Sequence, residues 1–185
     1  MATARKIILW FLGIAIVVIA ILYTIGVNVP RIEMWKVKKQ GEIYEKQVQE
    51  ELNKYKNDFD GGKTPEETLE LFITALRAGD IEKASKYYEI SVQEEEKKYF
   101  NETLLKRGSM NESAEFYSNL LKTGEKKCND KNDGCDFVRV YIETATTTYE
   151  IRGTNQKIIV PAGEKTTESV SLGVNEYTGV WKISQ

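Results

Sequence analysis

The chain of 185 residues carries 26 lysines and arginines against 28 acidic residues, and it contains no histidine. The absence of histidine excludes Ser-His and Cys-His nucleophile pairs, histidine general bases and histidine-ligated metal sites. Basic and acidic residues are intermixed, so the basic footprint of a nucleic-acid-binding protein is missing. We therefore expect no nucleic-acid partner, and no motif points to a metal or an organic cofactor.

A short tail of residues 1–6 precedes an uncharged apolar run, IILWFLGIAIVVIAILYTIGV, over residues 7–27. At ~1.5 Å per residue a helix of this length extends roughly 30 Å, the thickness of a hydrocarbon core. The run predicts a transmembrane helix over residues 7–29, a single-pass signal anchor with the lipid bilayer as its partner. A cleaved signal peptide is the alternative, but its apolar core is normally only about 7–15 residues long.

Residues 30–62 are charged and helix-prone, and we interpret them as a helical stalk or linker. Apolar and aromatic side chains recur at helical spacing along one face: Tyr44, Val48, Leu52, Tyr55 and Phe59. One interpretation is a coiled-coil stalk that forms a homodimer or a scaffold in a membrane assembly. The other is a helix that packs on its own domain, since the stripe covers only about two heptads. Gly41 is expected to break or soften this helix.

The segment from Thr64 to Tyr88 predicts two helices joined by a tight turn. Thr64 is a ready N-cap, Pro65 suits the first helical position, and Glu67 completes a capping box. Gly79 is a natural residue to end the helix. Two further helices are expected before Gly124, and the charged run over residues 94–98 is interpreted as a solvated helix face.

The two cysteines, Cys128 and Cys135, lie in one polar loop, CNDKNDGC. A disulfide is the interpretation we favour, and two free thiols are the alternative. Calcium binding is a third hypothesis, but with Gly134 as the loop glycine Lys131 falls on a ligand position.

The orientation of the predicted anchor is not fixed by charge, because Arg5 and Lys6 precede it and several basic residues follow it. A disulfide persists in an oxidising compartment. We therefore predict a cytoplasmic N-terminus and an extracytoplasmic C-terminal domain, and the reverse orientation stays open.

Residues 136–185 are rich in β-branched and aromatic residues that alternate, interrupted by short turns. Strands are predicted over residues 137–149, 157–160, 166–174 and 180–183. Short turns favour an antiparallel meander. Helices followed by strands predict an α+β domain over residues 63–185, with the helices covering one face of a curved sheet.

The pattern TPEETLELFITALRAGDIEKA over Thr64–Ala84, with the ending Trp181-Lys182-Ile183, resembles the nuclear-transport-factor-two-like (cystatin-like) superfamily. The resemblance covers about Lys63–Ser184 and is greatest to small bacterial lipoprotein or membrane-anchored members of unknown function. It implies a cone-like sheet that is wrapped by helices and encloses a pocket. Enzymatic members typically place His, Asp or Tyr in that pocket. Because this chain lacks histidine, no catalytic residue is carried over.

These features favour a non-catalytic domain that binds a small molecule or a protein partner of the envelope. An oligomerisation module is the second hypothesis, and an enzyme without histidine is the third. Aromatic side chains with polar atoms suit a binding pocket. The candidate pocket residues are Tyr87, Tyr88, Phe116, Tyr141 and Trp181.

Overall fold

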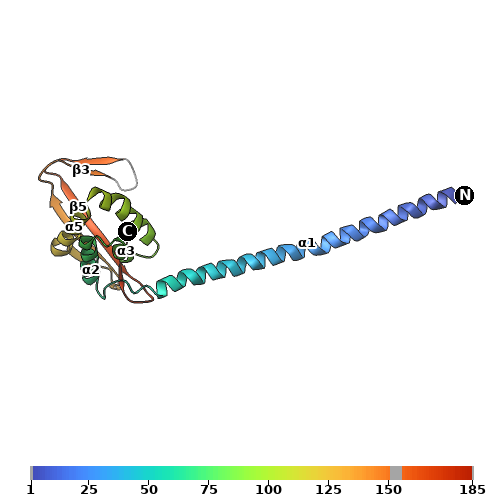
Figure 1. The fold of residues 1–185 in the computed structure, drawn as a ribbon, viewed down its shortest axis with the longest axis horizontal. Helices are drawn as coiled ribbons and strands as arrows, with labels where there is room; N and C mark the ends of the chain where they lie inside the picture. The colour runs from blue at the N-terminus through green and yellow to red at the C-terminus, as the bar shows by residue number, and fades with distance from the viewer. Residues whose placement is uncertain (1, 151–155, 185) are drawn as a thin grey trace. The chain divides into compact units, whose positions relative to one another are not determined.

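The computed structural model describes residues 2–150 and 156–184, which form two compact units, residues 1–53 and 54–185. The first unit belongs to one long helix, α1 (Ala2–Lys56). The second unit is α+β with an antiparallel sheet, as predicted (Figure 1). Its helices are α2 (Pro65–Ala78), α3 (Ile81–Lys86), α4 (Gln93–Tyr99), the π-helical segment η1 (Phe100–Leu105) and α5 (Met110–Thr123). Its strands are β1 (Glu125–Cys128), β2 (Gly134–Ile142), β3 (Thr147–Glu150), β4 (Lys157–Val160), β5 (Lys165–Val174) and β6 (Trp181–Ser184).

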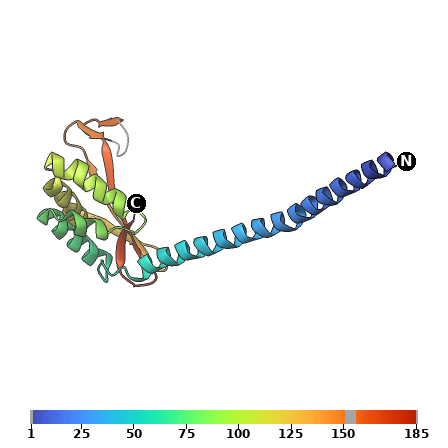
Figure 2. The ribbon, with the colours of Figure 1, turned by 45° about the vertical axis from the view of Figure 1, so that its right-hand side comes forward.

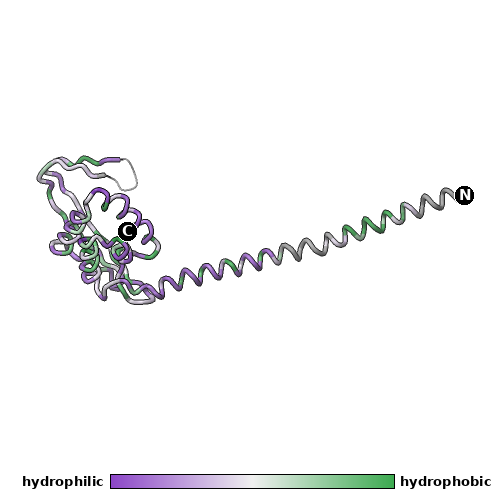
Figure 3. Tube along the Cα trace, in the orientation of Figure 1, coloured by the Kyte–Doolittle hydropathy of each residue, from purple (hydrophilic) through white to green (hydrophobic). Residues whose placement is uncertain are grey.

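The predicted transmembrane helix over residues 7–29 is wrong, because the described part of the chain contains no helix long and apolar enough to cross a membrane. Exposed apolar side chains of α1 include those of Trp10, Ile16 and Tyr23, and Figure 3 shows hydrophobic residues along part of this helix. The predicted single-pass localisation and the signal-anchor interpretation are corrected with it.

Helix α1 continues through Gly41, so the predicted break there is wrong. A single glycine costs only about 1 kcal/mol relative to alanine, and the surrounding residues are good helix formers. The helix ends at Lys56. Phe59, the last member of the predicted apolar stripe, therefore lies outside the helix.

The main sheet has the order β1-β2-β5-β6, with every neighbouring pair antiparallel. The helices of this unit lie on one side of it (Figure 2). The expected simple meander is wrong in one respect, because the predicted strand over residues 137–149 divides into β2 and β3. Strands β3 and β4 pair only with each other, as a separate ribbon inserted between β2 and β5.

Helix α2 packs against α5 and β6, and α5 packs against β2 and β5. The predicted cap is confirmed: the Thr64 hydroxyl accepts from the Glu67 amide at 3.1 Å, and Gly79 ends the helix with φ 68°. The buried stripe of α2 consists of Leu69, Phe72, Ile73 and Leu76. From the sheet it meets Phe137, Val170, Leu172 and Ile183 in one core.

The last strand, β6, is held on both of its edges. β5 pairs with one edge, and on the other the Ile183 amide donates to the Tyr87 carbonyl at 2.8 Å. The Trp181 amide donates to the Gly62 carbonyl at 2.9 Å. A Cβ on Gly61 would stand 2.4 Å from the Trp181 carbonyl oxygen, so the chain passes β6 too closely for any residue but glycine.

Between these contacts the Lys182 ammonium is buried in the protein. Its Nζ donates to Asp58 Oδ1 at 2.5 Å, to the Asp60 carbonyl at 2.6 Å and to the Lys86 carbonyl at 2.7 Å. The Lys182 and Asp58 side chains are only 3% and 8% exposed. Burial lowers the pKa of Lys182, against the raising effect of Asp58. One side chain thus joins β6 to the segment after α1 and to the end of α3.

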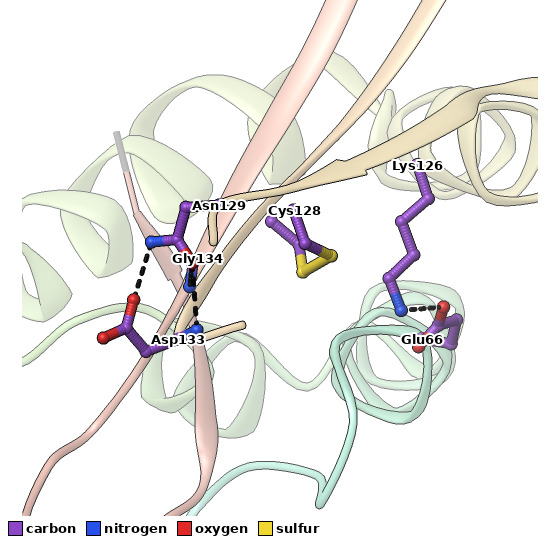
Figure 4. Close-up of a disulfide and its surroundings, with 7 residues drawn as sticks. Glu66, Lys126, Cys128, Asn129, Asp133 and Gly134 are labelled. Carbon is purple, nitrogen blue, oxygen red and sulfur yellow. Dashed lines mark hydrogen bonds and ion pairs between the residues drawn. A yellow bond between two sulfur atoms is a disulfide. The ribbon is translucent and has the colours of Figure 1, made fainter. Parts of the chain in front are cut away.

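The disulfide between Cys128 and Cys135 is confirmed. The two cysteines are partners across β1 and β2, a strand pair in place of the expected loop. The Asn129 amide donates to the Gly134 carbonyl at 2.9 Å (residues labelled in Figure 4). The cysteines therefore occupy the adjacent non-hydrogen-bonded position, where facing side chains approach most closely.

Calcium binding in this loop has no support from the geometry. Asn129 Oδ1 accepts from the Asp133 and Gly134 amides at 3.2 and 3.4 Å, and Asn129 Nδ2 donates to Asp133 Oδ1 at 2.6 Å (Figure 4). Within residues 2–150 and 156–184, acidic and cysteine side chains form no group that could hold a metal ion. The amide and carboxylate oxygens shape the turn.

We predict that Lys182→Met destabilises the protein by ~3–5 kcal/mol, because the Asp58 carboxylate stays buried without its counter-charge. The double variant Asp58→Asn/Lys182→Met should recover at least about 1 kcal/mol of this loss, because no charge is then buried. Urea denaturation of the full chain measures both. The exposed Lys98→Met is the control, with an effect within ~0.5 kcal/mol. A loss below about 1 kcal/mol for Lys182→Met would contradict the assignment.

We predict that the variant Cys128→Ala/Cys135→Ala unfolds at a free energy ~2 kcal/mol lower than the oxidised protein, because the unfolded chain loses its cross-link. A phosphine reductant should lower the stability of the wild type by a similar amount and leave the variant unchanged. An equal free energy of unfolding for the oxidised and the reduced wild type would show that the disulfide does not stabilise the fold.

Candidate functional site

The helices of the second unit surround a cavity of about 440 Å³, which we call the aromatic cavity. Its volume lies within the usual range of small-molecule sites, ~300–1,000 Å³. Six of its lining residues are aromatic: Phe72, Tyr88, Tyr99, Phe100, Phe116 and Tyr117. The remaining residues are Leu76, Glu96, Leu104, Glu112 and Ser113.

Aromatic packing fixes the walls of this cavity. The ring of Phe72, from α2, meets those of Tyr88 and Tyr117 edge to face, with centroid distances of 5.5 and 4.9 Å. Phe116 and Tyr117, neighbours on α5, are also perpendicular at 5.0 Å. Edge-to-face pairs are the favoured aromatic geometry and add about 0.5–1.5 kcal/mol each. The walls are therefore stiff and largely pre-formed.

The opposite wall comes from a helix whose winding changes. α4 passes into the π-helical segment η1, whose buried residues are Phe100 and Leu104. A π-helical turn is rare and is frequently found at functional sites. Both buried residues line the aromatic cavity, so the irregular turn contributes directly to its surface.

Glu96 contributes a buried carboxyl group to the lining of the aromatic cavity. It lies on α4, lines the aromatic cavity and is 0% exposed. The expectation that residues 94–98 form a solvated face is wrong at this one position. Val92, Glu96 and Phe100 are spaced by four residues, so Glu96 falls on the apolar side of the helix. This spacing in the sequence could have predicted the burial of Glu96, but the charged residues on both sides of it favoured a solvated face.

The Tyr88 and Tyr117 hydroxyls lie 3.3 Å apart and form a wall shared with a second hollow. This hollow, of about 290 Å³, is bounded on its far side by sheet residues that include Ser169, Ser171 and Ser184. The two tyrosines thus separate an aromatic compartment from a hydroxyl-rich one.

The structure brings together only two of the five predicted pocket residues. Tyr88 and Phe116 line the aromatic cavity. Tyr87 and Trp181 are buried in the core, 3% and 8% exposed. The backbone separates these neighbouring tyrosines: Tyr87 ends α3 in a helical conformation, whereas Tyr88 pairs with Ile183 of β6 in an isolated bridge.

Tyr141, the fifth predicted residue, belongs to a polar network at the end of β2. Its hydroxyl lies 3.0 Å from Glu168 Oε1 and 2.9 Å from the Tyr149 hydroxyl. Burial, reinforced by these hydrogen bonds, raises the pKa of Tyr141. Tyr149 donates to Glu143, which also accepts from the Thr147 hydroxyl at 3.1 Å. The network fastens the β3–β4 ribbon to the main sheet.

We predict that Glu143 titrates below the ordinary glutamate value of 4.5, because the Tyr149 hydroxyl stabilises its carboxylate. Since its pKa is lower in the folded state, Glu143 stabilises the fold above about pH 4.5 and loses this effect as pH falls through the lowered value. Carbon-13 NMR of the carboxyl group measures the midpoint. Tyr149→Phe should raise it, whereas Tyr177→Phe should leave it unchanged. A wild-type midpoint at or above 4.5 would contradict the network.

The aromatic cavity combines six aromatic side chains with two carboxyl groups, the buried one of Glu96 and the exposed one of Glu112. Comparisons with protein-family models, with curated proteins and with solved structures found no match to this chain.

Proposed function

We propose that this protein binds a small aromatic or apolar molecule in the aromatic cavity, without converting it chemically. The ligand carries one N–H or O–H group that donates a hydrogen bond to Glu96. The observation that supports this most directly is the full burial of the Glu96 carboxyl group on the lining of a cavity of about 440 Å³.

The size of the aromatic cavity supports a binding role. Protein interiors are close-packed, and voids larger than a water molecule are few. Leu104 and Ser113 on the lining leave space that larger side chains would occupy. A ligand offers a reason for leaving it open.

The chemistry of the lining defines the ligand class. Six aromatic side chains favour flat, apolar molecules, which gain both burial and edge-to-face contact. A carboxyl group accepts hydrogen bonds in either protonation state, so a donor on the ligand suits Glu96 whether or not it is ionised. A ligand with only acceptors would meet the oxygens of an ionised Glu96 unfavourably.

Indole and 1-methylindole form a matched pair of probes, since methylation removes the N–H donor and little else. We predict that the full chain binds indole with a Kd of about 1 mM or tighter. It should bind 1-methylindole about fivefold more weakly, the effect of one lost hydrogen bond of ~1 kcal/mol. Isothermal titration calorimetry measures both.

Two variants of α5 locate the binding. Ser113→Trp fills the aromatic cavity and should weaken indole binding at least about tenfold, a loss of ~1.4 kcal/mol. Asn119→Trp adds the same ring at an exposed position of the same helix and should change the affinity less than about twofold. Absence of indole binding, or an equal loss in both variants, would contradict the proposal.

A further inference from the structure

A second cavity, distinct from the aromatic one, lies beside the buried Lys182–Asp58 pair. It has a volume of about 270 Å³, and we call it the acidic cavity. Three of its lining residues are carboxylates, Asp58, Glu89 and Glu176, against the single ammonium of Lys182. Its walls thus carry a formal excess of two negative charges, which attracts a cation.

Asp58 supplies an unmet hydrogen-bond acceptor to this cavity. Its Oδ1 accepts from the Lys182 ammonium at 2.5 Å and from the Asp60 amide at 3.2 Å. Its Oδ2 is buried and has no hydrogen-bond partner among the described residues. A buried polar atom without a partner costs about 1–3 kcal/mol, and a donor from a ligand would remove that cost.

Two tyrosines give the acidic cavity an aromatic rim. Tyr55 and Tyr177 both line it, and the Tyr177 side chain is 51% exposed. The Lys56 ammonium already lies 5.8 Å from the centre of the Tyr177 ring. Aromatic faces attract ammonium groups at such distances. The rim is therefore suited to the same group on a ligand.

We propose that the acidic cavity is a binding site for a small primary alkylammonium ion. The ammonium donates to Asp58 Oδ2 and is neutralised by Glu89 and Glu176, while its alkyl chain packs against Ile90 and Val174, which also line the cavity. Lys182 does not compete for the same oxygen, because its three hydrogen bonds go to Asp58 Oδ1 and two backbone carbonyls. The site is independent of the ligand proposed for the aromatic cavity.

The test uses n-butylammonium chloride as the probe and the full chain labelled with nitrogen-15. We predict that butylammonium shifts the backbone amide signals of Gly173 to Tyr177 and that 1-butanol, its neutral counterpart, binds at least about tenfold more weakly. Butyltrimethylammonium, which keeps the charge but has no N–H donor, should bind at least about fivefold more weakly than butylammonium.

A matched pair of double variants locates the site without disturbing the Lys182–Asp58 pair. Glu89→Gln/Glu176→Gln removes two wall charges and should weaken butylammonium binding at least about tenfold. Glu102→Gln/Glu115→Gln removes two exposed charges from η1 and α5 and should have less than about a twofold effect. Equal binding of butanol, equal effects of the two double variants, or shifts confined to residues around Glu96 would overturn the proposal. None of these outcomes bears on indole binding in the aromatic cavity.

Discussion

The buried ammonium of Lys182 is the constraint on which the architecture of the folded unit depends. Its acceptors, Asp58 Oδ1 and the carbonyls of Asp60 and Lys86, come from segments far apart in the sequence. A buried charge is tolerated only when it is paired and its donors are satisfied. The segment after α1, the end of α3 and the last strand must therefore converge on one point.

This convergence also creates the acidic cavity. The carboxylate that neutralises Lys182 uses one oxygen for the ammonium, and its other oxygen has no hydrogen-bond partner in the described part of the chain. A hydrophobic pair of similar volume would often be equally stable or more so. We therefore interpret the ion pair mainly as a contact that holds three chain segments together and leaves one carboxylate oxygen of Asp58 as an acceptor. A net gain in stability is not needed to explain it.

The aromatic cavity depends on a different principle, the stiffness of interlocking rings. Phe72 contacts Tyr88, Phe100 and Tyr117, so one residue of α2 determines where three other segments place their rings. These ring contacts hold the walls of the cavity in place. Glu96 adds a buried carboxyl group to this lining.

Local signals in the sequence predicted much of this unit. The cap at Thr64, the end at Gly79 and the alternation of Val170 and Leu172 are properties of neighbouring residues, and each was confirmed. The disulfide followed from two cysteines in one turn-rich segment. These features could be predicted because no distant contact is needed to produce them.

What the sequence could not show within the folded unit depends on contacts between segments that are apart in the chain. The apolar face of β2 is exposed at Val140 and Ile142, 48% and 65%, while the polar face of Tyr141 and Glu143 is covered by the ribbon that follows. Alternation shows that a strand has two faces but does not show which one is covered. The burial of Glu96 and the role of Lys182 likewise depend on partners that only the tertiary fold supplies.

We propose that the aromatic cavity admits a ligand and is not merely a gap between packed rings. The most direct measurement is the set of intermolecular nuclear Overhauser effects between unlabelled indole and the methyl-labelled full chain. We predict nuclear Overhauser effects from the indole ring to the methyl groups of Leu76 and Leu104, which line the cavity, and none to Leu172 in the sheet core. Effects only to exposed methyl groups, or none at saturating indole, would show that the cavity is closed to ligands and would contradict the proposal.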